Sequence, residues 1–457
     1  MKRLAVIALG AALFVGVAVA GSGRRGMLER PLVLRGAVST SPLLGLEYRS
    51  TQAWLERLDR RTLKRLSGRR LGLAEFSGGW SYSPDRSLLA FGNQSSTALT
   101  YLPARIRLIN AYTLRKVRDV PLGLTGEVMY TYWVAPARLL ALVQSREDSG
   151  TEGERPIATD RVIVVDPTTG AVRATEKLEG TVAALAKADH ALALVLEGKS
   201  YGPVRLVVAD DNSRLDSVTL DGVRAGLHQT PAGVPRVDGV AVAVDRQRGR
   251  AYVVAAGEPV AEAALATLTV EYHVPSEPVS LLGRLHNWLE PPAHAKGPLE
   301  GSWRSAVWLG GGRLAVFGRD NSTYSTGDGL AVRERPSGLV VIDTQNWASH
   351  MVDPDSSAIV VATQALVSWG WSWDGGTERL TGAGLSIYDQ KGVRRFHLFG
   401  ARVVSDVQVV GRRAFVWRAG LDGRYSIVDL SAGRQLRTIR GRAVPLVLNS
   451  TGAPFYP

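Results

Sequence analysis

Residues that could carry chemistry are few in this sequence and widely spaced. The two nearest of its seven histidines lie eight residues apart, so neither H-E-x-x-H nor another paired-histidine metal motif occurs. The chain has no cysteine, which excludes disulfides, thiolate metal sites and cysteine nucleophiles. It also lacks a phosphate-binding P-loop and the S-x-x-K motif. We therefore predict no catalytic residue, no cofactor-binding residue, no metal ligand and no cofactor.

A dinucleotide-binding signature is present in form only. Residues 21–26 read G-S-G-R-R-G, which matches the G-x-G-x-x-G loop that approaches a pyrophosphate. Such a loop must open a helix, whereas Pro31 and Gly36 interrupt the segment that follows. We expect no dinucleotide at this loop.

Basic residues are concentrated near the beginning of the chain. Residues 21–75 contain 12 lysines and arginines against 5 aspartates and glutamates, a net charge of +7, and the whole chain carries +13. Guanidinium groups bind phosphate and carboxylate groups through paired hydrogen bonds, so Arg60, Arg61, Arg69 and Arg70 are a candidate surface for a polyanion. An ordinary solvated basic face is the alternative interpretation, and we expect no nucleic acid as partner.

Three tryptophans form a second candidate binding surface. Trp369, Trp371 and Trp373 alternate along one expected strand, so their side chains project from the same side of the sheet. Such a row of indole rings is suited to stacking against sugar rings. The alternative is that the rings fill the space between two packed sheets.

The first twenty residues are typical of an export signal. Met1-Lys2-Arg3 is positively charged, residues 4–20 are continuously apolar, and Ala18-Val19-Ala20 has the form of a signal-peptidase site. We expect an exported protein of the extracellular space, periplasm or cell envelope. Because seventeen apolar residues approach the length needed to span a bilayer, retention of this segment as an N-terminal membrane anchor is the alternative.

The elements that must position the candidate residues are repeated β-hairpins. With 45% hydrophobic residues and 49 glycines, the composition argues against a disordered, collagen-like or polytopic membrane protein. A recurring unit consists of an apolar strand, an Asp or Asn, a short turn and a second strand with Arg or Lys, at a spacing of roughly 53 residues, close to the period of propeller blades. The instances lie at residues 54–66, 106–117, 162–174, 205–218, 339–352, 385–396 and 425–439, with a weaker one at 268–273.

Part of this pattern resembles known propeller repeats. Residues 79–92, G-W-S-Y-S-P-D-R-S-L-L-A-F-G, are similar to the SPDG…LAFG phrase of WD40-like and YVTN-type repeats, and the hairpin at Ile106 to Leu114 resembles their IxxxDxxT phrase. The resemblance implies an all-β fold, a β-propeller of four-stranded antiparallel blades. The Gly-His pair and the third-strand Trp-Asp of true WD40 repeats are missing, and the one Trp-Asp pair, Trp373-Asp374, lies at the end of an expected second strand. A WD40-type peptide-binding role is therefore without support.

The repeats predict one large domain. We expect a signal peptide at 1–20, a basic segment at 21–43, a single propeller at 44–448 and a tail at 449–457. Eight blades are favoured and seven are the alternative, with strands at 44–48 and 444–448 closing the ring by pairing the two ends of the chain. The connections at 94–103, 145–159, 319–336 and 374–381 are expected to share one rim, where binding groups accumulate. A short helix is expected at 279–290, either capping the ring or docking to a membrane or partner.

These observations favour a binding protein. We expect an exported, non-catalytic, monomeric propeller that presents a face to a partner protein or to an envelope polysaccharide or polyanion, with membrane contact only through an uncleaved N-terminal segment. The alternative is an enzyme, because the resemblance also extends to propellers that act as lactonases, lyases or quinoprotein dehydrogenases with an axial active site. Axial residues would come from different blades, so sequence spacing alone does not decide between the two classes.

Overall fold

Every described element of the chain is a β-strand. The computed structural model describes residues 27–34, 41–49, 52–73, 78–93, 102–147, 157–198, 200–210, 214–229, 233–276, 300–327, 329–420, 424–441 and 443–446. These ranges contain strands β1 to β33 and no helix. No helix among them is therefore long and apolar enough to cross a membrane. The expected signal peptide, the helix at 279–290 and the tail at 449–457 lie outside the described residues.

The first sheet combines the two ends of the chain. Its strands are β1 (Leu44–Arg49), β2 (Gln52–Leu58), β3 (Arg65–Leu73) and β33 (Val444–Pro445), in the order β3-β2-β1-β33. β33 pairs antiparallel with β1 through the partners Gly45↔Pro445 and Leu46↔Val444. The first and last strands are thus neighbours, as predicted, while closure of a complete ring stays a prediction.

The remaining strands pair antiparallel mainly in consecutive sets of four. The first set is β4 (Gly78–Tyr82), β5 (Leu88–Gly92), β6 (Pro103–Asn110) and the start of β7 (Lys116–Ala135). The second is the end of β7, β8 (Arg138–Glu147), β9 (Ile157–Val165) and β10 (Val172–Lys177). The third is β11 (Thr181–Lys187), β12 (Ala191–Glu197), β13 (Gly202–Asp210) and the start of β14 (Leu215–Gln229). The next two are β16 (Val240–Asp245), β17 (Arg250–Ala255), β18 (Val260–Ala264) and β19 (Val270–His273); and β20 (Glu300–Gly310), β21 (Arg313–Thr326), β23 (Leu339–Asp343) and β24 (Ala348–Asp353). The last two are β25 (Ala358–Ala362), β26 (Ala365–Asp374), β27 (Arg379–Tyr388) and β28 (Arg394–Leu398); and β29 (Val404–Val410), β30 (Arg413–Arg418), β31 (Arg424–Asp429) and β32 (Arg434–Arg440).

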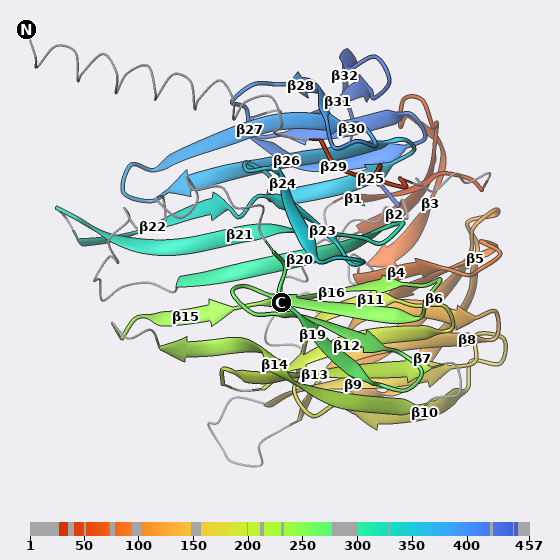
Figure 1. Cartoon of the computed structure of the whole chain (residues 1–457). Coiled ribbons are helices and arrows are strands. Elements are labelled where there is room, and N and C mark those ends of the chain that lie inside the picture. The colour runs from red at the N-terminus through yellow and green to blue at the C-terminus, as the bar shows by residue number, and fades with distance from the viewer. Residues whose placement is uncertain are drawn as a thin grey trace, which may run out of the picture.

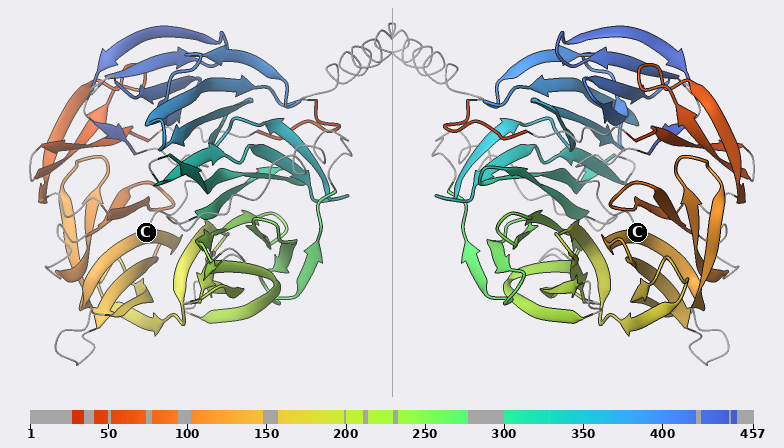
Figure 2. Two further views of the ribbon diagram at one scale, coloured as in Figure 1. Left: turned by 90° about the vertical axis from the view of Figure 1, so that its left-hand side faces the viewer. Right: turned by 90° about the vertical axis from the view of Figure 1, so that its right-hand side faces the viewer.

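These sets follow one another around a common centre in chain order (Figure 2). The N-terminal strands β1 to β3 lie beside the C-terminal strands β29 to β32, and leucines of the first sheet pack against Phe415 and Tyr425 of the last. This arrangement of four-stranded antiparallel sheets confirms the predicted all-β propeller architecture. The number of blades stays a prediction, because extra strands merge several sets into larger sheets.

Two extra strands, β15 (Pro235–Asp238) and β22 (Gly329–Pro336), join neighbouring sets of strands into one continuous sheet. β15 pairs antiparallel with the end of β14 and parallel with the start of β20, and β22 pairs with both β21 and β26. The ends of β15, β20, β21 and β22 project toward the same, left-hand side in Figure 1. The connections at 319–336 and 374–381 are therefore extended hairpins rather than open loops, because pairing satisfies their backbone groups.

The turns explain why the Asp or Asn of each repeated phrase is needed. The side chains of Asn110 and Asp166 accept hydrogen bonds from backbone N–H groups two and three residues ahead. Asp429 makes the same pair of hydrogen bonds in the last hairpin. A short acceptor at this position fixes the tight turn that joins two antiparallel strands, so the sequence pattern and the hairpins correspond directly.

The core lies between neighbouring sheets. Between the first and second sheets it contains Leu44, Leu46, Leu55, Leu89, Phe91 and Ile109, all nearly inaccessible to solvent. Part of the basic N-terminal segment joins another such core: Leu28, Leu32 and Leu34 pack with Phe317 and Tyr388. Residues 27–34 are thus an integral part of the propeller.

Candidate anion-binding cleft

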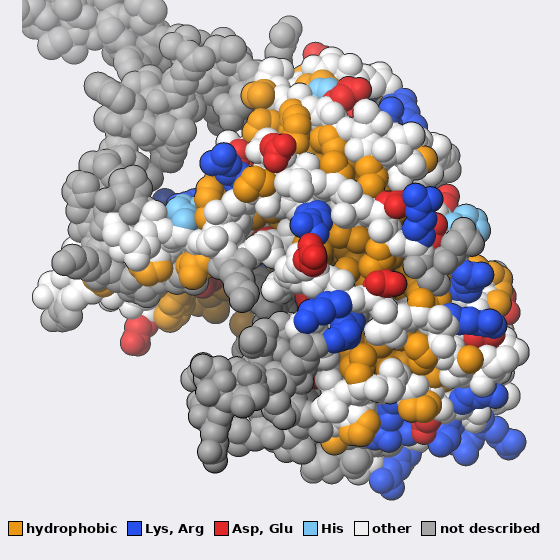
Figure 3. All heavy atoms as spheres, turned by 90° about the horizontal axis from the view of Figure 1, so that it is seen from below, with side chains coloured by type: hydrophobic (Ala, Val, Ile, Leu, Met, Phe, Trp, Pro, Cys, Tyr) orange, Lys and Arg blue, Asp and Glu red, His pale blue; other side chains and the backbone are white. Residues whose placement is uncertain are grey.

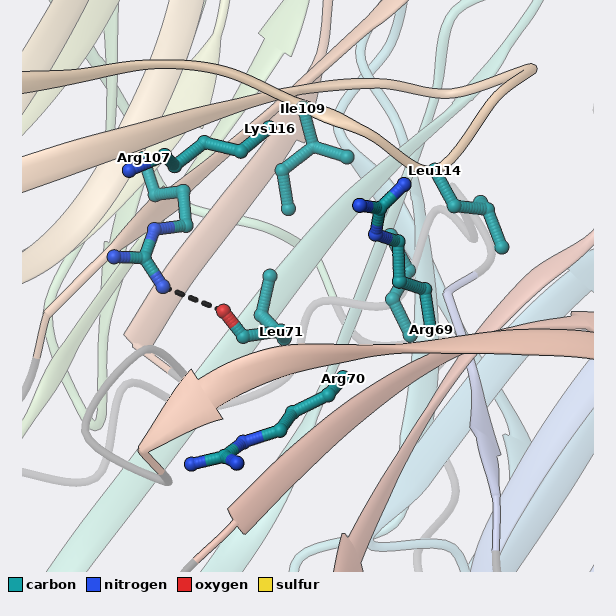
Figure 4. Close-up of a pocket in the computed structure, with 8 residues that line it drawn as sticks. Arg69, Arg70, Leu71, Arg107, Ile109, Leu114 and Lys116 are labelled. Atoms are coloured by element: carbon teal, nitrogen blue, oxygen red, sulfur yellow. Dashed lines mark hydrogen bonds between the residues drawn. The ribbon is translucent and has the colours of Figure 1, made fainter.

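A cleft lined by four cations opens between the first two sheets. Strand β3 contributes Arg69 and Arg70, strand β6 contributes Arg107, and Lys116 begins β7. Leu55, Leu71, Ile109 and Leu114 are its apolar lining residues. The cavity has a volume of about 260 Å³, and Figure 4 shows Arg107 and Arg69 on opposite sides of Leu71 and Ile109. The cleft therefore offers positive charge around an apolar floor.

A β-bulge explains how three successive residues of one strand reach the same cleft. Side chains of a regular strand alternate between its two faces, so Arg69, Arg70 and Leu71 would not all line one cavity. Here Trp54 pairs with Arg70 and Ala53 pairs with Gly72, which leaves Leu71 without an opposite residue. The extra residue changes the direction of the strand and disrupts the alternation.

Arg107 connects the two sheets across the cleft. Its Nη1 donates a hydrogen bond to the carbonyl oxygen of Leu71 at 2.5 Å, drawn as the dashed line in Figure 4. Its Nε and Nη2 donate to the two carboxylate oxygens of Asp119 at 2.7 and 3.0 Å. This paired contact holds the guanidinium plane in one orientation.

Asp119 is shared by two of the cations. Lys116 Nζ donates to Asp119 Oδ2 at 3.1 Å, on the same carboxylate that Arg107 engages. Burial alone would raise the pKa of Asp119, but the hydrogen bonds from Arg107 and then Lys116 outweigh burial and hold that pKa below its usual value. Asp119 is therefore ionised at neutral pH and neutralises part of the positive charge.

The other two cations are not neutralised by a carboxylate within the described part of the chain. Arg70 Nε donates to the amide oxygen of Gln52 at 2.7 Å, and the side chain of Arg69 is exposed, with no hydrogen bond or ion pair to another described residue. Four cations with one carboxylate leave a net charge of +3. Arg69 is thus available for an incoming anion.

Charge elsewhere on the surface is more mixed. On the face shown in Figure 3, basic and acidic side chains are interspersed with apolar ones over most of the area, with basic side chains gathered toward one edge. Some exposed arginines outside the cleft pair with carboxylates, as Arg205 does with Glu179 at 2.8 Å and Arg214 with Asp216 at 2.9 Å.

The structure divides the four arginines singled out in the sequence into two pairs. Arg69 and Arg70 line the cleft, whereas Arg60 and Arg61 lie in the turn between β2 and β3. Arg60 donates a hydrogen bond to the carbonyl oxygen of Ser41, and the carbonyl oxygen of Arg61 accepts one from Arg413 at 3.0 Å. The second pair contacts neighbouring chain segments and does not line the cleft.

The three tryptophans occupy different environments along β26. Trp369 is buried in the core between β26 and the strands of the last sheet. Trp371 is partly exposed beneath the guanidinium of Arg319, whose Cζ lies 3.8 Å from the ring centroid. Trp373 lies in the pairing of β26 with β22, opposite Glu334. Trp369 thus fills the core between two sheets. Trp371 and Trp373 lie instead in the extended part of β26, beside β21 and β22.

Sequence reasoning missed Arg107, Lys116 and Asp119. The hairpin containing them was recognised, and its register places Arg107 opposite Asp119 on adjacent strands. That register was a readable signal for the pair, since oppositely charged cross-strand partners stabilise a hairpin. Their approach to β3, however, depends on how two sheets pack, which no local pattern encodes.

One group among the described residues has the composition of a metal site. Glu262, Glu271 and His273 place one ligand atom each within 4.8 Å of one another on β18 and β19. The sequence spacing of the three residues matches no metal motif, because Glu262 of β18 approaches His273 of β19 only through the pairing of these two strands.

Comparison with known proteins supports the fold. No protein-family model matches the sequence, and no curated protein matches it. Among solved structures, dihydro-heme d1 dehydrogenase NirN in complex with DHE is 12% identical, with coverage of 92% of this chain and 77% of that chain and a TM-score of 0.51. Sqt1 of Saccharomyces cerevisiae is 10% identical over 79% of this chain and 84% of that chain, with a TM-score of 0.45, and the WD40 domain of Toxoplasma gondii coronin is 9% identical over 86% and 83%, with a TM-score of 0.38. The similarity to NirN, together with the sets of four antiparallel strands, confirms that the chain folds as a β-propeller.

Proposed function

We propose that this chain is an exported propeller that binds an anionic polymer of the cell envelope through the cleft between β3, β6 and β7. The observation that carries the proposal is the net charge of +3 around the apolar floor, with Arg69 exposed and without a partner among the described residues. Guanidinium groups bind phosphate, sulfate and carboxylate groups through paired hydrogen bonds, and the apolar floor accommodates the carbon skeleton between them.

The size of the cleft favours a polymer over a compact ligand. A cavity of about 260 Å³ is slightly smaller than those that enclose a whole small molecule. It suits one charged unit of a chain whose neighbouring units extend over the adjacent surface. The exposed side chains of Arg69, Arg70 and Lys116 extend the positive charge of the cleft toward that surface.

Export is supported by the sequence of residues 1–20, which combines a basic start, an apolar stretch and an A-x-A ending. An exported basic protein encounters envelope polymers rich in phosphate and carboxylate groups. The enzyme alternative is supported by the propeller fold alone, because 12% identity to a dehydrogenase carries no information about activity.

Binding can be tested with heparin as a defined polyanion probe and the chain lacking residues 1–20. Fluorescence anisotropy of labelled heparin would be measured for Arg69→Glu and for Arg434→Glu, an exposed arginine on β32 that carries the same change in charge. We expect Arg69→Glu to weaken binding at least tenfold and Arg434→Glu to change it less than twofold. Affinity should also fall steeply as salt rises from about 50 to 200 mM. Equal losses in the two variants would show that binding follows overall charge and would overturn the assignment to the cleft.

A further inference from the structure

A second group of side chains is arranged for a different ligand. Glu262 of β18 and Glu271 of β19 are direct cross-strand partners in the antiparallel pairing. Two carboxylates at such a position repel each other and destabilise the hairpin unless a cation lies between or beside them. Arg250, whose Nε lies 3.7 Å from Glu262 Oε1, offsets part of this repulsion, and a bound cation would remove the rest.

His273 directs a nitrogen atom toward the same two carboxylates. Its Nε2 lies 3.3 Å from Glu262 Oε2 and 3.8 Å from Glu271 Oε2. This nitrogen is buried and makes no hydrogen bond among the described residues, although a carboxylate oxygen is close. A buried polar atom without a partner is costly, so a ligand on this nitrogen would stabilise the arrangement.

Neighbouring residues hold this arrangement in place. The His273 ring stacks on Trp347, with ring centroids 3.7 Å apart and the planes inclined by 9°. Arg250 approaches Glu262 through the other carboxylate oxygen, Oε1, at 3.7 Å, so that Oε2 remains directed to the histidine. Such outer contacts orient metal ligands and fix the position of an imidazole ring.

The two separations from His273 Nε2 approach the coordination geometry of a small divalent ion, and all three donor atoms lie within 4.8 Å of one another. Zinc binds imidazole nitrogen and carboxylate oxygen at about 2.0 to 2.2 Å, which in a tetrahedron separates neighbouring donor atoms by about 3.3 to 3.6 Å. The separations of 3.3 and 3.8 Å at His273 require only small side-chain adjustments. Glu271 is two-thirds exposed, so water has access to a fourth coordination position.

We propose that Glu262, Glu271 and His273 bind a divalent transition-metal ion, represented by Zn²⁺, through one oxygen of each carboxylate and Nε2 of the imidazole. The ion would neutralise the facing carboxylates and satisfy the buried nitrogen at once. The site is independent of the cationic cleft, since it lies on β18 and β19 and shares no residue with the cleft.

Direct metal titration of the untagged chain lacking residues 1–20 tests the proposal. Calorimetry with Zn²⁺ should give one site per chain, and Co²⁺ should give the absorption of a low-symmetry four- or five-coordinate complex. Glu262→Gln and Glu271→Gln should each weaken Zn²⁺ binding at least tenfold. His397→Gln is the matched control, because His397 contacts Ser386 through Nδ1 at 3.1 Å and lies outside the group. This control should bind Zn²⁺ like the parent chain.

Thermal unfolding adds a second readout. Removing metal with a chelator should lower the melting temperature of the parent chain but not that of Glu262→Gln, because the substitution also removes the repulsion between carboxylates. The variant His273→Gln should also weaken Zn²⁺ binding. If this variant fails to fold, the variant Glu271→Gln, which changes an exposed side chain, still provides the comparison. The proposal is wrong if the parent chain binds no Zn²⁺ stoichiometrically, or if both glutamate variants bind it with unchanged affinity.

Discussion

The hydroxyl group of Tyr425 in β31 donates a hydrogen bond to the carbonyl oxygen of Thr62, 2.8 Å away in the turn before β3. This contact joins the last sheet of the chain to the first. Phe415 and Ile427 of the last sheet and Leu58 and Leu63 of the first bury the surrounding surface. The two ends of the chain are therefore held together by sheet packing as well as by the pairing of β33 with β1.

Deleting residues 444–457 should lower the melting temperature by several degrees. The deletion removes β33 and the buried side chain of Leu446, which packs among Leu44, Leu46 and Leu55. Loss of one buried leucine costs about 2 to 5 kcal/mol, and the exposed edge of β1 adds to this cost. Differential scanning calorimetry of this variant beside one lacking only residues 449–457 isolates the contribution of β33. Equal melting temperatures would refute a closing role for the strand.

Residues 27–34 should stabilise the fold through their buried leucine side chains and not through the exposed side chains between them. Leu32 is 1% exposed and packs against another sheet, whereas Val33 beside it is 40% exposed. We expect Leu32→Ala to lower the free energy of unfolding by about 2 to 5 kcal/mol, and Val33→Ala to change it by less than about 1 kcal/mol. Urea unfolding followed by tryptophan fluorescence measures both. If the two substitutions have equal effects, residues 27–34 do not pack as described.

Arg107 and Arg69 should differ in their effects on stability and on binding. Arg107→Gln removes the paired contact to Asp119 and the link to Leu71, which should cost about 1 to 3 kcal/mol of unfolding free energy. Arg69→Gln breaks no side-chain hydrogen bond or ion pair to another described residue and should change stability by less than about 0.5 kcal/mol. Both variants should bind heparin more weakly. A stability loss in Arg69→Gln as large as in Arg107→Gln would contradict the description of the cleft.

The fold was largely predictable because its signals are local. Turns at Asn110, Asp166 and Asp429 need a short side-chain acceptor, and strands need alternating apolar residues, so each hairpin is encoded within about fifteen residues. Repetition of these hairpins then predicted the propeller. The extra strands β15 and β22 were not predicted, because they pair with strands from other hairpins rather than with their own neighbours alone.

The candidate site was predicted only in part, for a related reason. The cluster of charge identified Arg69 and Arg70, but their joint position in the cleft depends on the bulge at Leu71. Arg107 and Lys116 enter the cleft from a different sheet, as a consequence of packing between sheets. Chemistry assembled from different sheets leaves no spacing rule in the sequence. Glu262 and His273 share one sheet, but they meet through the pairing of β18 with β19 and form no spaced metal motif.

Two buried glutamates between the first and last sheets make stability depend on pH. Glu47 of β1 and Glu56 of β2 are nearly inaccessible to solvent and hydrogen-bond to each other, and Arg49 contacts both, at 2.5 and 3.0 Å. Burial, followed by the contact with Glu47, raises the pKa of Glu56 to about 6, although Arg49 and Arg65 oppose this rise. The folded chain therefore retains a proton that the unfolded chain releases near pH 4.5.

Because the folded state binds more protons in this interval, the contribution of Glu56 to the free energy of unfolding should fall as pH rises from about 4.5 to 6. The loss should reach at most about 2 kcal/mol, the equivalent of the shift in pKa. Glu56→Gln, which resembles the protonated side chain, should remove this part of the pH dependence and leave the variant relatively more stable at pH 7. Urea unfolding at a series of pH values measures the effect, with the exposed Glu176→Gln as control. A Glu56→Gln profile parallel to that of the parent chain from pH 4.5 to 6 would show that Glu56 titrates normally and that the carboxyl pair holds no extra proton.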